Sequence, residues 1–314
     1  MSSREEMSRR QKGKLKEGSI DYTTERLNEN SINIDLKSTE EILHVINDED
    51  KKVAYVVEKE IPNIAKAVDI MADVIGNGGR VFYVGPGTDG RLGVVDAAEC
   101  PPTFGIGPGV VEAIMAGGQE AVFKAREWVE DEGNTGAADL AGKNPASKDL
   151  IVGISADGRS DYVLDAVRQA RTIGSRVIVL VNNPGTELAG LADVAIEPVV
   201  GPEVLLGSTR MKVGISQKMV LTMLSTASMI KLGKTYSNLM VNIKSTNNKL
   251  IERAKKLVMI ATGADYETAE KTLAKADKDV KVSILMLKKG VNSREAVKAL
   301  QKCGGVVRKA LEIL

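Results

Sequence analysis

The chain has 314 residues, which is enough for one large core or for a core with a small satellite domain. Its 43 lysines and arginines balance 42 acidic residues, so we expect neither a nucleic acid nor a membrane surface as partner. A membrane-spanning helix needs about 18 consecutive apolar residues, and no apolar stretch of the sequence is that long. One histidine and two cysteines are too few for a structural zinc site or a His-based triad.

The N-terminal part is charged first and helical afterwards. Residues 1–22 are rich in lysine, arginine and glutamate, and they predict a flexible tail without the apolar segment of a signal peptide. Ser38-Thr39-Glu40-Glu41 is a capping box that opens a short helix, and two further helices are predicted over 47–60 and 62–75. Cys100 and Cys303 lie in different predicted elements, so we expect both to be reduced thiols of a cytoplasmic protein.

From Arg80 onward, strands alternate with helices. Strands are predicted at 80–84, 110–115, 149–155, 176–181 and 193–197, and helices near 88–98, 118–131, 160–173 and 209–233. Runs such as Val177-Ile178-Val179-Leu180-Val181 are apolar at every position, which is typical of strands buried on both faces. The pattern predicts an α/β fold, a three-layer sandwich on a parallel five-stranded sheet.

The last part of the chain reads as purely helical, with helices predicted at 246–262, 265–276, 279–288 and 293–312. Their short spacing suggests a small C-terminal three-helix bundle. We therefore expect three parts: a tail over 1–22, an α/β domain over 23–245, and a helical module over 246–314.

A glycine-rich turn follows the first predicted strand. Gly85 to Gly90 spells G-x-G-x-x-G, and such a turn directs backbone N–H groups and the positive end of a helix at an anionic or hydroxyl-rich ligand. A nicotinamide site would also need an acid at the tip of the next strand. That strand, 111–115, runs into Ala116-Gly117-Gly118 instead, so the dinucleotide interpretation is disfavoured.

The chain resembles the N-acetylmuramic acid 6-phosphate etherases, a branch of the sugar isomerase (SIS) superfamily that also includes the glucokinase regulatory protein. The resemblance covers nearly everything after residue 22. It is carried by Thr24-Glu25, the glycine-rich turn, Glu99-Cys100-Pro101-Pro102-Thr103, Glu130-Asp131, Gly201-Pro202-Glu203, Gly207-Ser208-Thr209-Arg210-Met211-Lys212 and Asn238-Leu239-Met240-Val241. It implies the SIS fold, and it implies that the C-terminal module is of the ubiquitin-associated type.

The resemblance also implies a reaction and its residues. Family members remove D-lactate from the C3 ether of an amino sugar by elimination and water addition, which two carboxylates can perform without a metal or an organic cofactor. Glu99 and Glu130 hold the positions of these catalytic carboxylates. The implied substrate-binding residues are Gly87, Thr88, Asp89, Gly90, Asp157, Gly158, Arg159, Ser160, Glu203, Ser208 and Thr209. Lys212 and Lys218 either bind the lactyl carboxylate of the substrate or serve only to keep a long helix soluble.

The two loops that bind phosphate in the family depart from the family pattern in this chain. Family members bind the sugar 6-phosphate through two loops that each carry a serine, and here Asp89 and Asp157 stand in its place. Either the substrate is unphosphorylated and the aspartates accept hydrogen bonds from its hydroxyls, or the pocket no longer catalyses the family reaction. A phosphate could be accommodated only if both carboxylates turned away to cap helices.

Three functional classes remain open. The first is a carbon–oxygen lyase acting on an N-acetylmuramic-acid-type sugar in peptidoglycan recycling. The second is a non-catalytic sugar-binding regulator, and the third, an aldose–ketose isomerase, is disfavoured by Glu99-Cys100-Pro101-Pro102. Helix 209–233 is apolar on more than one face, so we expect a homodimer with the pocket at or beside the subunit interface.

Overall fold

A computed structural model describes residues 22–130, 135–243 and 248–314, so the predicted tail over 1–22 lies outside the described residues except for Tyr22. The chain divides into two compact units. The first runs to Ala97 and from Val111 to Leu224, and the second comprises Ala98–Val110 and Ser225–Leu314. No helix of the described residues is long and apolar enough to cross a membrane.

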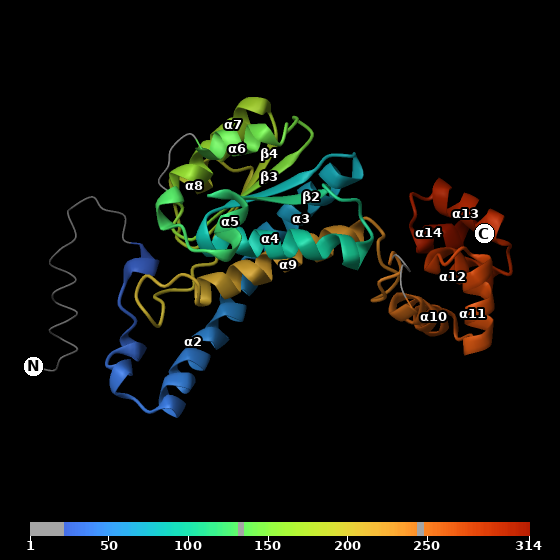
Figure 1. Ribbon diagram of the computed structural model, residues 1–314, viewed down its shortest axis with the longest axis horizontal. Coiled ribbons are helices and arrows are strands. Elements are labelled where there is room, and N and C mark those ends of the chain that lie inside the picture. The colour runs from blue at the N-terminus through green and yellow to red at the C-terminus, as the bar shows by residue number, and fades with distance from the viewer. Residues whose placement is uncertain (1–21, 131–134, 244–247) are drawn as a thin grey trace, which may run out of the picture. The chain divides into compact units, whose positions relative to one another are not determined.

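A parallel five-stranded sheet forms the core of the first unit (Figure 1). Its strands are β1 (Val81–Gly85), β2 (Val111–Met115), β3 (Leu150–Ser155), β4 (Arg176–Val181) and β5 (Val194–Ile196). Their order is β2-β1-β3-β4-β5 and every pair is parallel. The predicted strands and the α/β class are confirmed.

Helices and short 3-10 turns precede, connect and follow these strands. They are η1 (Thr23–Glu25), η2 (Glu29–Ser31), η3 (Ile34–Leu36), α2 (Thr39–Lys59), α3 (Ile61–Gly76), α4 (Gly87–Phe104), α5 (Gly118–Phe123), η4 (Glu127–Glu130), α6 (Thr135–Gly142), α7 (Asp161–Ile173), α8 (Glu187–Gly190) and α9 (Lys212–Lys231). Ser38 and Glu41 form the predicted capping box, but α2 continues through the boundary predicted near Asn47. The helix predicted over 118–131 ends early, at Phe123.

The two faces of the sheet are covered by different helices, with α6 and α7 on one side and α4 on the other (Figure 1). Successive side chains of a strand point to opposite faces. Phe82 and Val84 accordingly join the apolar cluster that α7 completes. Tyr83 points to the other face, where its hydroxyl donates a hydrogen bond to Asp96 of α4. The result is the predicted three-layer sandwich, with the carboxyl ends of β1 and β3 meeting at one edge.

The second unit is helical in its C-terminal part. Its helices beyond α9 are α10 (Asn248–Thr262), α11 (Tyr266–Lys275), α12 (Val280–Lys289), α13 (Ser293–Lys302) and α14 (Val307–Ile313), which share one apolar cluster. The helix predicted over 293–312 is divided because Gly304 and Gly305 both adopt positive φ angles of 60° and 80°. The region therefore has more helices than the three-helix bundle that we expected.

Candidate functional site

A cleft of about 770 Å³ lies at the carboxyl ends of β1 and β3, where open α/β sheets bind their ligands. Its volume suits a small molecule. The lining residues are Thr24, Glu25, Pro86, Gly87, Thr88, Asp89, Arg91, Ala125, Arg126, Ser155, Ala156, Asp157, Arg159, Ser160, Gly207 and Thr209. All of them belong to the first unit.

The turn between β1 and α4 forms one wall of the cleft. It requires glycine at two points, because Gly87 has a φ of +48° and a Cβ at Gly90 would lie 2.1 Å from the carbonyl oxygen of Gly85. Thr88 and Asp89 occupy the first turn of α4. Gly90 itself does not line the cleft; it allows the close approach that shapes the turn.

The side chain of Asp89, which belongs to this turn, reaches the second loop of the cleft, between β3 and α7. It is 6% exposed, and its Oδ2 accepts a hydrogen bond of 2.7 Å from the backbone N–H of Ala156. Asp157 instead folds back onto its own loop. Its carboxylate accepts the N–H of Arg159 at 3.0 Å and pairs with the Arg159 guanidinium at 2.8 Å.

The loop between β3 and α7 is closed further by a hydroxyl. Ser155 Oγ accepts the N–H of Gly158 at 3.0 Å. Gly158 is tightly placed, since a Cβ there would meet the side chain of Thr186 at 2.6 Å and its φ is +72°. Gly158 lies outside the cleft lining for this reason, whereas Ser160 lies in it.

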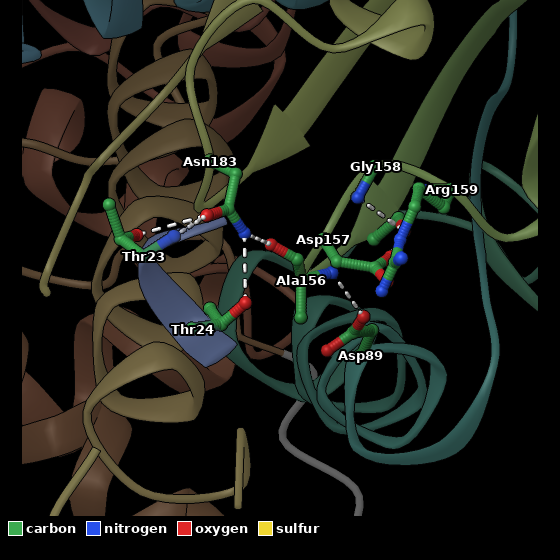
Figure 2. Close-up of polar contacts among 9 residues, drawn as sticks. Thr23, Thr24, Asp89, Ala156, Asp157, Gly158, Arg159 and Asn183 are labelled. Atoms are coloured by element: carbon green, nitrogen blue, oxygen red, sulfur yellow. Dashed lines mark hydrogen bonds and ion pairs between the residues drawn. The ribbon is translucent and has the colours of Figure 1, made fainter. Parts of the chain in front are cut away.

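The N-terminal segment forms a third wall and is tied to the second loop by one amide. Asn183 Oδ1 accepts from the backbone and the hydroxyl of Thr23, and Asn183 Nδ2 donates to Thr24 Oγ1 and to the carbonyl of Ala156. Figure 2 shows Ala156 between Asn183 on one side and Asp89 on the other. Sequence reasoning did not assign Thr24 and Glu25 to the site, although both stand in the motif Thr24-Glu25 that carries the resemblance.

The loop before α9 supplies Gly207 and Thr209 to the cleft, whereas Ser208 and Glu203 lie outside the lining. Glu203 is fully buried and accepts the backbone N–H groups of Lys212 and Val213 at 3.0 and 2.9 Å. Burial raises the pKa of Glu203, and these hydrogen bonds only partly offset that effect. Glu203 is therefore an anchor for the start of α9.

Neither Lys212 nor Lys218, the two lysines of α9 considered as substrate ligands, lines the cleft. Lys212 is 1% exposed and its Nζ lies 2.6 Å from Glu49 Oε2, so it holds α9 against α2. Burial alone would raise the pKa of Glu49, but hydrogen bonds from Lys212, Lys52 and Asn30 lower it to about 2. Lys218 is bonded to Thr222 at the surface. The expectation that these lysines meet a substrate carboxylate does not fit their positions.

Of the two carboxylates implied as catalytic, Glu99 is not among the lining residues of the described cleft. Glu99 is exposed and lies ten residues after Asp89 on α4, a spacing of about 15 Å along a helix. Glu130 ends η4, which follows the lining residues Ala125 and Arg126; its side chain lies outside the described part of the chain. The described cleft thus joins Gly87, Thr88, Asp89, Asp157, Arg159, Ser160 and Thr209 of the expected site.

Arginines of the cleft were not among the expected binding residues, apart from Arg159. Arg91 donates to the carbonyls of Ala121, Val122 and Lys124. Arg126 forms an ion pair with Glu120. Arg91 directly follows the glycine-rich turn, and this position could have indicated that Arg91 lines the cleft.

Comparisons with known proteins agree with this architecture. Residues 137–227 match the SIS domain model, and residues 63–170 match that of the glucokinase regulatory protein N-terminal SIS domain. The chain is 51% identical over 290 residues to the N-acetylmuramic acid 6-phosphate etherase of Clostridium beijerinckii, covering 92% of this chain and 95% of the relative. It is 48% identical over 289 residues to the protein of that name from Clostridioides difficile, with the same two coverages. A solved phosphoheptose isomerase from Neisseria gonorrhoeae aligns with a TM-score of 0.46 and 17% identity, over 61% of this chain and 98% of that one.

Proposed function

The chain belongs to the N-acetylmuramic acid 6-phosphate etherase family, and we propose that it is a carbon–oxygen lyase that releases D-lactate from an N-acetylmuramic-acid-type sugar. The observation that carries this proposal is an identity near 50% that extends over 92% of the chain. A cleft of suitable size at the carboxyl ends of β1 and β3 supports it. The sugar would bind there with its hydroxyls toward the two loops.

The chemistry requires proton transfers at two places, C2 of the sugar and the oxygen at C3. In the open-chain sugar, the C1 aldehyde acidifies the proton on C2, and a base removes it. The C3–oxygen bond then breaks, the electron pair leaves with lactate, and an acid protonates the departing oxygen. Water then adds to C3 of the unsaturated aldehyde: it gives a proton to the same group, which is now a base, and C2 takes back a proton from the base that removed it. Positioned carboxylates are adequate for such steps.

We assign Glu99 as the acid that protonates the lactate oxygen and later takes the proton of water, and Glu130 as the base at C2. The assignment rests on their positions in the family motifs. Because Glu99 is exposed and outside the cleft lining, we infer that a second copy of the chain completes the site. Val95, one turn earlier on α4, is also exposed, at 45%. A homodimer would bury this surface.

We infer from its two cysteines that the protein is cytoplasmic. Cys100 is buried and Cys303 half-buried, and neither forms a disulfide. The proposed role is the recycling of peptidoglycan amino sugars, since the substrate named for the relatives carries the lactyl ether of muramic acid.

Incubation of the purified chain with N-acetylmuramic acid and with its 6-phosphate, followed by a D-lactate assay, tests the proposal. We expect lactate from at least one of the two sugars. A sugar-binding regulator, the alternative function, would bind one of them and release none. Binding without release from either sugar would contradict the lyase assignment.

A further inference from the structure

Three backbone donors of the loop between β3 and α7, those of Ala156, Gly158 and Arg159, are satisfied by the protein itself. The N–H of Ala156 bonds to the carboxylate of Asp89, and the N–H of Arg159 bonds to the carboxylate of Asp157. The N–H of Gly158 bonds to Ser155 Oγ. A phosphate in such a loop is normally held by successive backbone N–H groups. Here carboxylate and hydroxyl oxygens already occupy the N–H groups of Ala156, Gly158 and Arg159.

The cations of the cleft are also engaged. Arg91 donates to three backbone carbonyls, Arg126 pairs with Glu120, and Arg159 pairs with Asp157. Arg159 additionally lies 4.3 Å from the ring centroid of Tyr22. Each of these three guanidiniums therefore already has an acceptor within the protein, and none is reserved for a bound anion.

Among the described residues that line the cleft, the formal charges cancel. Three arginines face three acids, namely Asp89, Asp157 and Glu25. A site for a sugar phosphate dianion would be expected to carry a net positive charge. A neutral lining with carboxylates at its loops instead suits hydroxyl groups, which donate charge-assisted hydrogen bonds to a carboxylate.

Resting on the proposed function, we propose that Asp89 and Asp157 set the specificity of this cleft for an N-acetylmuramic-acid-type sugar whose O6 is a free hydroxyl. The two carboxylates already accept the backbone N–H groups of Ala156 and Arg159, and they repel a dianion placed against the same loops. Asp89 cannot simply be regarded as a helix cap, because its buried carboxylate bonds to Ala156 of the other loop. Asp157 likewise bonds within its own loop and to Arg159 rather than to a helix end.

The test compares the two sugars in two measurements. Lactate release gives the ratio of kcat/KM for N-acetylmuramic acid and its 6-phosphate, and calorimetry gives the ratio of their dissociation constants. We expect the unaltered protein to prefer the free sugar in both. Asp89→Ser with Asp157→Ser should move each ratio toward the 6-phosphate by at least about tenfold, or about 1.4 kcal/mol. Asp89→Asn with Asp157→Asn keeps the side-chain shape, removes both charges, and should move the ratios in the same direction.

Asp161→Ser is the matched control. It removes a carboxylate from the exposed first turn of α7, beside the same loop but outside the cleft lining, and it should leave both ratios unchanged. Preference of the unaltered protein for the 6-phosphate, or ratios that do not move in either double variant, would overturn the inference while the lyase function stands. Absence of lactate from both sugars would contradict the lyase function, and the calorimetric ratio would still decide the specificity.

Discussion

The ammonium of Lys212 lies 2.6 Å from the carboxylate of Glu49, and both side chains are almost completely buried. This ion pair joins α9 to α2 across a sequence separation of 163 residues. Lys212 also supplies one of the two backbone N–H groups that Glu203 accepts. The start of α9, and with it the loop that carries Gly207 and Thr209 into the cleft, is therefore fixed by buried charge rather than by apolar packing alone.

Glu49→Gln should destabilise the fold. The substitution removes the carboxylate that is hydrogen-bonded to the buried ammonium of Lys212, and breaking a buried pair in this way costs about 3–5 kcal/mol of unfolding free energy. Urea unfolding followed by circular dichroism measures the loss. Glu49→Leu combined with Lys212→Met removes both charges and should recover most of the stability. A double variant as unstable as the single one would show that the charges are not the cause.

The same pair predicts a specific dependence on pH. Because the pKa of folded Glu49 is about 2, against an ordinary value of 4.5, the unfolded chain binds the extra proton between these values. The stability contributed by Glu49 is thus complete above about pH 4.5 and is lost as the pH falls toward 2, by up to about 3 kcal/mol. Unfolding measured between pH 6 and pH 3 should show the difference between the unaltered protein and Glu49→Gln shrinking with acidity. A constant difference would argue against the lowered pKa.

Glu99→Gln should abolish lactate release. Glutamine keeps the volume and the hydrogen bonding but cannot transfer a proton, so we expect a loss of about a hundredfold or more in kcat. Sugar affinity, measured by calorimetry, should be nearly unchanged. Glu58→Gln, at an exposed position of α2, is the control and should remain active. Retention of half the activity in Glu99→Gln would remove this residue from the mechanism.

Association through α4 can be tested at Val95. Light scattering at micromolar concentration should give the mass of a dimer. Val95→Asp places a charge on the same helical face as Glu99, four residues away, and should shift the protein toward the monomer while reducing lactate release at low protein concentration. A monomeric unaltered protein with full activity would contradict completion of the site by a second copy.

Two glycines of α6 form a matched pair for stability. A Cβ at Gly136 would lie 1.9 Å from the carbonyl oxygen of Tyr162, whereas a Cβ at Gly142 would meet nothing within 4 Å. Gly136→Ala should therefore force α6 away from α7 at a cost of about 1–3 kcal/mol. Gly142→Ala should be neutral or stabilise by up to about 1 kcal/mol. Thermal unfolding of both variants checks the contrast, and equal effects would refute the close approach of the two helices.

The sheet could be predicted because its strands are short, apolar at nearly every position and bounded by glycine or charge. Helix ends were harder. Pro101 and Pro102 suggested an end near residue 98, yet α4 continues to Phe104 through both. The predicted break before Asn47 is absent, because α2 continues uninterrupted from its capping box to Lys59.

The part of the site that could not be predicted from the sequence depends on hydrogen-bond partners that lie far apart in the chain. The glycine-rich turn and the loop 155–160 were expected, since each follows a strand of a parallel sheet. The bond from Ala156 to Asp89 spans 67 residues, and the Asn183 bonds to Thr23 span 160. Periodicity carries no information on such pairs. Lys212 was considered a ligand for substrate for the same reason: its partner Glu49 lies in a distant helix.

One consequence concerns the chemical ageing of the molecule. The amide of Asn183 connects the N-terminal segment to the loop of Ala156, and its conversion to a carboxylate would break the bonds that its Nδ2 donates to Thr24 and Ala156. Asparagine is hydrolysed in proteins mainly through attack by the backbone nitrogen of the next residue. That residue is Pro184, whose nitrogen carries no hydrogen and is already part of a ring. The amide on which this wall of the cleft depends is thereby protected from the reaction that most often destroys asparagine.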